Sequence, residues 1–93
     1  MALLTEQLVA ALLRETKSAH ILAFAASNGE DPDWPRWYAQ YLAPKLQDLL
    51  GRRFDLETLA AELRALDAEH SKLTTPEPWP EFYARSLVSR HSV

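Results

Sequence analysis

The chain has 93 residues, of which 47% are hydrophobic and 25% are charged, and it contains no cysteine. This length allows one domain with one core, and the lack of thiols excludes disulfides, thiolate metal sites and cysteine nucleophiles. A net charge of −3 does not provide the basic surface of a nucleic-acid binder, and no apolar run approaches the roughly 20 residues that span a bilayer. We therefore expect one cytoplasmic domain over residues 1–93, with neither nucleic acid nor membrane as its partner.

The first helical segment is expected over residues 5–27. Thr5 is suited to cap its N-terminus, and Asn28-Gly29 offers a left-handed stop after its last turn. An acidic turn follows at residues 30–33. Such residues before a helix stabilise its N-terminal dipole more often than they gather a cation, so we favour the capping role.

A second helix is expected over residues 35–50, before Gly51. Pro35 falls in its first turn, where proline is tolerated, whereas Pro44 falls inside it and should kink or split it. The third helix is expected over residues 55–73.

Asp55 is the predicted cap of this third helix, and Pro80 opens a fourth after a loop rich in proline and threonine. Leu and Ala dominate over Val, Ile and Thr throughout the chain, a balance that favours helices over strands. No segment shows the alternation typical of a strand.

An internal repeat is the strongest feature of the sequence. The block A-L-L-R-E-T-K-S-A-H, which ends at His20, recurs as A-E-L-R-A-L-D-A-E-H, which ends at His70. The block W-P-R-W-Y-A-Q-Y-L from Trp34 recurs as W-P-E-F-Y-A-R-S-L from Trp79. The order is the same in both copies, and the interval from histidine to tryptophan is five positions shorter in the second (20 to 34 against 70 to 79).

Each copy of the repeat predicts one helical hairpin, the first over about residues 5–50 and the second over about residues 55–91. Neither hairpin can bury its apolar face alone, so the two should pack on each other. We therefore predict an all-α fold: a four-helix bundle made of two tandem helical hairpins related by an approximate two-fold pseudo-symmetry.

The repeated motif resembles a pattern found in small bacterial all-helical proteins of uncharacterised function. The resemblance rests on an Ala-His pair in the first helix, followed by Asp-x-x-Trp-Pro-x-Trp-Tyr-Ala-x-Tyr. It covers both copies, although the second has Glu-His, with Phe82 in the place of Trp37 and Ser86 in the place of Tyr41. It implies no catalytic residues.

Both histidines of the repeat fall on apolar helical stripes. The stripes are Val9, Leu13, Thr16, His20 and Phe24 in the first copy, and Leu59, Leu63, Leu66, His70 and Leu73 in the second. Both imidazoles should therefore face the core, where a ring without a hydrogen-bond partner costs about 1–3 kcal/mol. The repeated polar aromatic residues are the expected partners: Trp34, Tyr38, Trp79 and Tyr83.

Two interpretations of these residues remain open. We favour structural histidines that hold each hairpin together by bonding Tyr, Trp or loop backbone. The alternative is a pocket between the hairpins for a metal or a small acidic ligand, lined by His20, His70, Tyr38, Tyr83, Trp34 and Trp79. The metal is disfavoured, because Asp67 precedes His70 by three positions whereas Lys17 holds that place before His20, and two histidines are too few for zinc.

The sequence contains no recognisable catalytic motif. Its serines lack the context of a nucleophile elbow, and two glycines are too few for a phosphate-binding loop. We therefore predict no catalytic residue, no metal site and no cofactor.

Trp37 and Tyr41 form the expected protein interface. They lie four positions apart on a face displaced from the stripe of Trp34 and Tyr38, and they expose an aromatic patch unless the first loop covers it. The preferred function is accordingly a non-enzymatic helical protein for interaction with a partner or with itself, as a homodimer. The alternative is a small-ligand-binding or enzymatic domain that uses the pocket between the hairpins.

Overall fold

The computed structural model describes residues 2–27, 30–74 and 77–91. These residues form α1 (Ala2–Ala23), a short 3-10 turn η1 (Ala25–Ser27), α2 (Trp34–Leu50), α3 (Leu56–Ser71) and α4 (Trp79–His91). No strand occurs in this described part of the chain. The predicted all-α, four-helix architecture is therefore confirmed.

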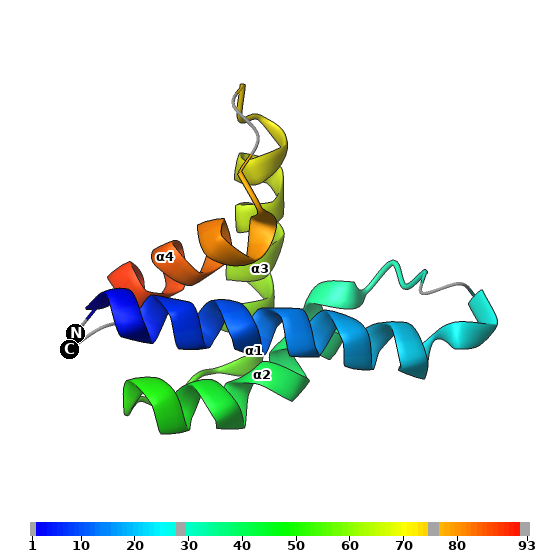
Figure 1. The fold of residues 1–93 in the computed structure, drawn as a ribbon. Coiled ribbons are helices and arrows are strands. Elements are labelled where there is room, and N and C mark those ends of the chain that lie inside the picture. Colours follow the sequence, from blue (N-terminus) through cyan, green and yellow to red (C-terminus); the bar gives the residue numbers. More distant parts are fainter. Residues whose placement is uncertain (1, 28–29, 75–76, 92–93) are drawn as a thin grey trace.

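The helices pack mainly across the two halves of the chain rather than within them. α1 packs mainly on α4, whose C-terminal end lies beside the N-terminal end of α1, and α2 packs mainly on α3 (Figure 1). Contacts within a half, between α1 and α2 or between α3 and α4, are less extensive. Exchanging α1 with α3 and α2 with α4 keeps the two main packing contacts, although α1 and α2 contact each other more than α3 and α4 do.

The core is built from equivalent positions of the repeat. Side chains with no exposed surface occupy both copies, and they include Leu13 and Leu63, Ala39 and Ala84, and Leu42 and Leu87. Complete burial of a leucine side chain contributes about 1.5–3 kcal/mol to folding. The leucines of both halves therefore lie in one shared core.

Two helix ends are formed as the sequence predicts. Gly51 ends α2 in the left-handed conformation with φ of 70°, and its N–H donates to the carbonyl of Gln47. Asp55 caps α3, because its carboxylate accepts a hydrogen bond from the Thr58 N–H at 2.9 Å.

Other predicted boundaries are wrong. α1 begins at Ala2, so Thr5 lies inside the helix and is not its cap. α1 ends at Ala23, and the chain continues as the turn η1, while Asn28-Gly29 lies outside the described residues. α2 is not split at Pro44, which is exposed on the surface of a continuous helix, so only the kink that the sequence offers as the alternative stays a prediction. α3 ends at Ser71, which leaves Leu73 outside it and 40% exposed.

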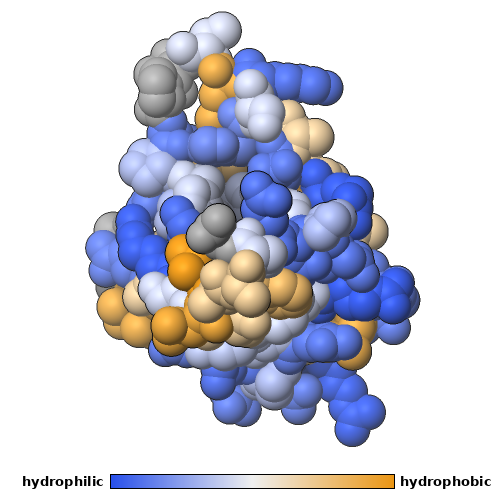
Figure 2. Space-filling model, turned by 90° about the vertical axis from the view of Figure 1, so that its right-hand side faces the viewer, coloured by the Kyte–Doolittle hydropathy of each residue, from blue (hydrophilic) through white to orange (hydrophobic). Residues whose placement is uncertain are grey.

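Apolar side chains also reach the surface. A patch of them gathers on the face that carries the C-terminal end of α1 (Figure 2), where Ile21 is 47% and Leu22 is 78% exposed. None of the helices in the described ranges is long and apolar enough to cross a membrane.

Candidate functional site

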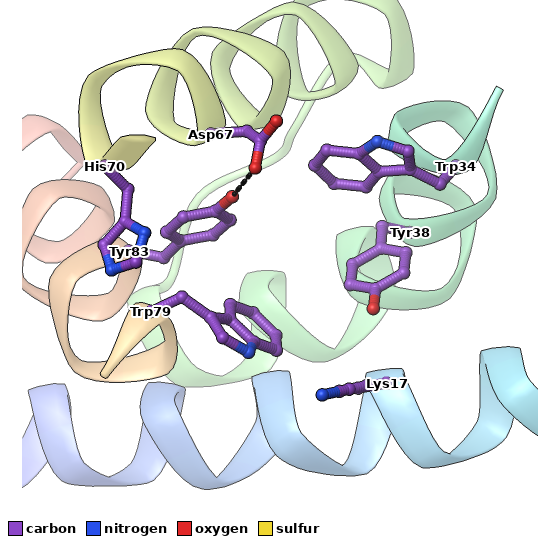
Figure 3. A pocket seen from close by; sticks show the side chains of 7 residues that line it. All are labelled: Lys17, Trp34, Tyr38, Asp67, His70, Trp79 and Tyr83. Atoms are coloured by element: carbon purple, nitrogen blue, oxygen red, sulfur yellow. Dashed lines mark hydrogen bonds between the residues drawn. The ribbon is translucent and has the colours of Figure 1, made fainter. Parts of the chain in front are cut away.

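A cavity of about 260 Å³ opens between the two halves (Figure 3). Every one of the four α-helices contributes to its lining, which consists of Lys17, Trp34, Tyr38, Asp67, His70, Trp79 and Tyr83. Three pairs of these residues are equivalent in the repeat: Lys17 with Asp67, Trp34 with Trp79, and Tyr38 with Tyr83. The cavity therefore lies where the two copies of the repeat meet.

Four aromatic rings form most of the cavity wall. The rings of Trp34 and Tyr38 meet edge to face with centroids 5.1 Å apart, and those of Trp79 and Tyr83 repeat this contact at 5.1 Å. Tyr38 and Trp79 join the two pairs, with centroids 6.4 Å apart. Edge-to-face contacts at such distances stabilise the rings against one another. The two indoles point toward each other from opposite sides of the cavity (Figure 3).

One charged side chain of each sign borders the aromatic wall. Lys17 comes from α1 and Asp67 from α3, and within the described ranges neither of them forms an ion pair. The hydroxyl of Tyr83 donates to Oδ1 of Asp67 at 3.4 Å. Burial, together with the negative charge of Asp67, raises the pKa of Tyr83, so this phenol stays protonated at neutral pH.

The hydroxyl of Tyr38 has a different environment from that of Tyr83. Tyr38 is 8% exposed as a residue; its hydroxyl is not fully buried and has no hydrogen-bond partner among the residues that the structure describes. The hydroxyl points toward the side of the cavity on which Lys17 lies (Figure 3). Burial raises the pKa of Tyr38, so the group is a neutral donor at physiological pH. It is therefore placed to donate a hydrogen bond to a molecule in the cavity.

His70 lines this cavity and is half-buried. Its Nε2 lies 2.5 Å from the backbone carbonyl of Glu77, which accepts a hydrogen bond from the ring. The predicted bond to Tyr83 is absent, since the two rings only meet edge to face with centroids 6.5 Å apart. The ring is held by the loop before α4 instead.

His20 is buried, with 5% exposed, and it does not line the central cavity. It lines a neighbouring cavity of about 280 Å³, which it shares with Lys17, Trp34 and Tyr38. Its Nε2 lies 3.1 Å from Oδ2 of Asp31, while the Tyr38 ring meets the imidazole edge to face at 5.3 Å between centroids. The prediction that each ring bonds tyrosine, tryptophan or loop backbone is therefore wrong for His20, which meets a carboxylate, and confirmed for His70, which meets the loop carbonyl of Glu77.

The acidic turn before α2 accounts for this difference. Asp31 bonds His20 through one oxygen and accepts the N–H of Asp33 through the other, at 3.0 Å. Asp33 occupies the N-cap position of α2 without a side-chain capping bond. Asp31 therefore holds the ring of His20, while stabilisation of the α2 dipole by this acidic turn stays a prediction.

Trp37 and Tyr41, the predicted interface residues, are both half-buried. Their rings stack with centroids 5.5 Å apart, and the hydroxyl of Tyr41 donates to Glu15 of α1 at 2.6 Å. Trp37 also contacts the ring of His20, at 5.0 Å between centroids. This pair therefore covers part of α1 and keeps only part of its surface free.

The structure brings five of the six predicted pocket residues to one cavity and adds Lys17 and Asp67. In the sequence, Lys17 and Asp67 occupy equivalent positions before the two histidines and carry opposite charges. At that level, the difference served only as an argument against a metal site. Their position could have predicted their place in the cavity, because each lies three residues before a histidine, which is one helical turn away on the same face.

The lining of the cavity is mainly aromatic, with a few polar groups. The described lining contains no serine or threonine hydroxyl. No group of three or more His, Asp or Glu side chains suited to a metal ion occurs in the described part of the chain. The cavity thus offers aromatic surface, one side chain of each charge and the hydroxyl of Tyr38.

Comparison with known proteins gives no family for this chain. No family model matches it, and no curated protein or solved structure matches it with significant similarity. The resemblance to small bacterial helical proteins therefore stays a prediction.

Proposed function

We propose that the protein binds a small organic molecule in the central cavity. The observation that carries this proposal is the convergence of two aromatic pairs, related by the repeat, on one cavity of about 260 Å³. Binding sites for small molecules are typically concave and aromatic with a few polar groups, and they measure roughly 300–1,000 Å³ for drug-sized ligands. This cavity lies slightly below that range, so its ligand is smaller than a drug. A cytoplasmic location is part of the proposal.

The three tryptophans provide the test. Trp34 and Trp79 line the cavity, whereas Trp37 does not. In ¹H–¹⁵N spectra recorded with small aromatic, cationic, anionic and zwitterionic fragments, we expect a binding fragment to shift the two indole N–H signals from the cavity more than that of Trp37. Equal shifts of all three signals, or no shift with any fragment, would overturn the proposal.

A pair of bulky substitutions locates the binding. Asp67→Trp places an indole at the cavity, and Asp48→Trp places one on an exposed position of α2 that does not line it. We expect the first to abolish the fragment shifts and the second to leave them unchanged. Binding that survives Asp67→Trp takes place elsewhere on the molecule.

A role in protein interaction through Trp37 and Tyr41 is the second candidate. Its support is the stacked pair itself, which stays half-exposed and has no counterpart in the second half, where Phe82 and Ser86 stand. Sedimentation equilibrium of the native protein is its first test.

A further inference from the structure

We infer that the molecule bound in the central cavity is a small zwitterion that carries an organic ammonium group at one end and a carboxylate at the other. This inference rests on the proposed function. The ammonium lies among the aromatic rings on the side of Asp67, and the carboxylate lies on the side of Lys17 and the Tyr38 hydroxyl.

The aromatic wall suits an organic cation. Four rings from two equivalent pairs surround the cavity, and two of them are indoles, which attract cations more strongly than phenol or phenyl rings do. A methylated ammonium contacts such rings with its apolar methyl groups while its charge interacts with their faces. Asp67 borders the same rings and supplies the opposite charge.

Lys17 and Asp67 are not engaged with each other. They lie at opposite ends of the cavity (Figure 3), and neither forms an ion pair within the part of the chain that the structure describes. Arginines elsewhere on the same helices do form ion pairs, as Arg14 does with Glu81 of α4 and Arg64 with Asp33 before α2. Two separated charges of opposite sign across one aromatic cavity match the two ends of a zwitterion.

The two tyrosines distinguish the ends of the cavity further. Tyr83 already donates its hydroxyl to Asp67, which holds that carboxylate toward the rings. Tyr38 has no partner for its hydroxyl among the described residues, and this oxygen is open to the cavity although the residue as a whole is only 8% exposed. A ligand carboxylate near Lys17 accepts this hydrogen bond, and a carboxylate is a stronger acceptor than a neutral oxygen.

Three compounds of nearly equal shape test the inference. The zwitterion is 4-(trimethylammonio)butanoate, 5,5-dimethylhexanoate lacks its positive charge, and butyltrimethylammonium lacks its carboxylate. Titrations followed at the Trp34 and Trp79 indole N–H signals give three dissociation constants. We expect the zwitterion to bind about three- to fivefold more tightly than either analogue, since ion pairs at exposed side chains are worth little.

Matched variants assign each end. Asp67→Asn should remove the preference for the zwitterion over 5,5-dimethylhexanoate, and Lys17→Gln should remove its preference over butyltrimethylammonium. Tyr38→Phe should weaken the binding of both compounds that carry a carboxylate. The controls Asp48→Asn and Lys45→Gln change exposed charges that do not line the cavity and should change nothing.

The possible failures are distinct. If the three compounds bind equally, or if the variants leave the preferences intact, the zwitterion is wrong although the cavity binds small molecules. If none of the three binds while other fragments shift the cavity tryptophans, the inference also fails alone. If no fragment of any charge binds, both the inference and the proposed function are overturned.

Discussion

In the first half of the molecule, Lys17 stands one helical turn before a buried histidine, and in the second half Asp67 stands there before a half-buried one. Around these positions the halves agree closely: both place a tryptophan and a tyrosine edge to face at 5.1 Å on the same cavity. The buried frame is thus repeated, while the charges that border the cavity are opposite. Because the aromatic pairs are repeated while Lys17 and Asp67 carry opposite charges, the two ends of the cavity differ in charge.

The loops that hold the histidines differ in the same manner. His20 meets the carboxylate of Asp31, whose side chain is 11% exposed, whereas His70 meets the backbone carbonyl of Glu77. The first interaction involves a largely buried carboxylate, and the second involves an uncharged backbone carbonyl. Equivalent histidines are therefore expected to differ in what they contribute to stability.

The repeated frame predicts equal losses at equivalent core leucines. Leu42→Ala and Leu87→Ala each remove a fully buried side chain from the shared core, so each should lower the free energy of unfolding by about 2–5 kcal/mol. Urea denaturation measures both values. A loss at one position and almost none at the other would show that the two halves do not share one core in the way the packing indicates.

Substitutions of the two histidines, in contrast, should lower the free energy of unfolding by different amounts. His20→Leu removes the histidine partner of the Asp31 carboxylate, which is 11% exposed, and we expect a loss of about 1–3 kcal/mol. His70→Leu leaves an uncharged loop carbonyl without its partner, and we expect a loss of about 1 kcal/mol or less. Thermal and urea denaturation of both variants gives the comparison.

Asp31→Ala supplies the matching control for the first loop. If the bond between Asp31 and His20 is what matters, the double variant should lose less than the sum of the two single losses, because both remove the same interaction. Additive losses, or a larger loss for His70→Leu than for His20→Leu, would contradict the difference between the loops.

The sequence was sufficient for the parts of the structure that depend on periodicity. Leucine spacing placed Leu13, Leu63 and their neighbours in the core, and Gly51 and Asp55 marked helix ends through local backbone chemistry. The aromatic pairs were foreseen because the repeat contains them twice.

The rest depends on contacts between distant segments, which periodicity does not report. The pairing of His20 with Asp31 requires the loop after α1 to fold back, and the packing of α1 on α4 decides that Lys17 borders the cavity. Thr5 was misplaced because α1 begins a turn earlier than its capping residue suggests. Helix ends are the least determined by local sequence when tertiary packing extends them.

The starts of α3 and α2 provide a smaller contrast. Asp55 accepts hydrogen bonds from the backbone N–H and the hydroxyl of Thr58, which lower its pKa, whereas Asp33 makes no capping bond. Asp55→Ala should therefore lower the melting temperature more than Asp33→Ala does. Circular dichroism melts measure both.

The pH dependence gives this comparison a sign. Because the folded-state pKa of Asp55 is lowered, its stabilisation is present above its unfolded pKa of about 3.9 and is lost as the pH falls through the folded value. The gap in melting temperature between the native protein and Asp55→Ala should be full at neutral pH and should close in strong acid. A gap that does not change with pH would mean that the carboxylate does not act as the cap.

The smallest expected effect on stability lies at Tyr41, where the first half carries an aromatic ring and the second carries Ser86. Trp37 contacts His20, so its replacement by arginine would disturb the core as well as any interface. Tyr41→Ser instead introduces the residue of the other half and removes the half-exposed ring that stacks on Trp37. It should leave the helical content unchanged.

If this face mediates self-association, a symmetric dimer buries the stacked pair on both protomers, and Tyr41→Ser should raise the dimer dissociation constant by at least about fivefold. Gln40→Ser is the control, since it changes an exposed neighbour on the same helix. Sedimentation equilibrium separates the outcomes. A native protein that stays monomeric at high concentration rejects self-association, and a dimer that Tyr41→Ser and Gln40→Ser weaken equally, or not at all, rejects this face as its interface.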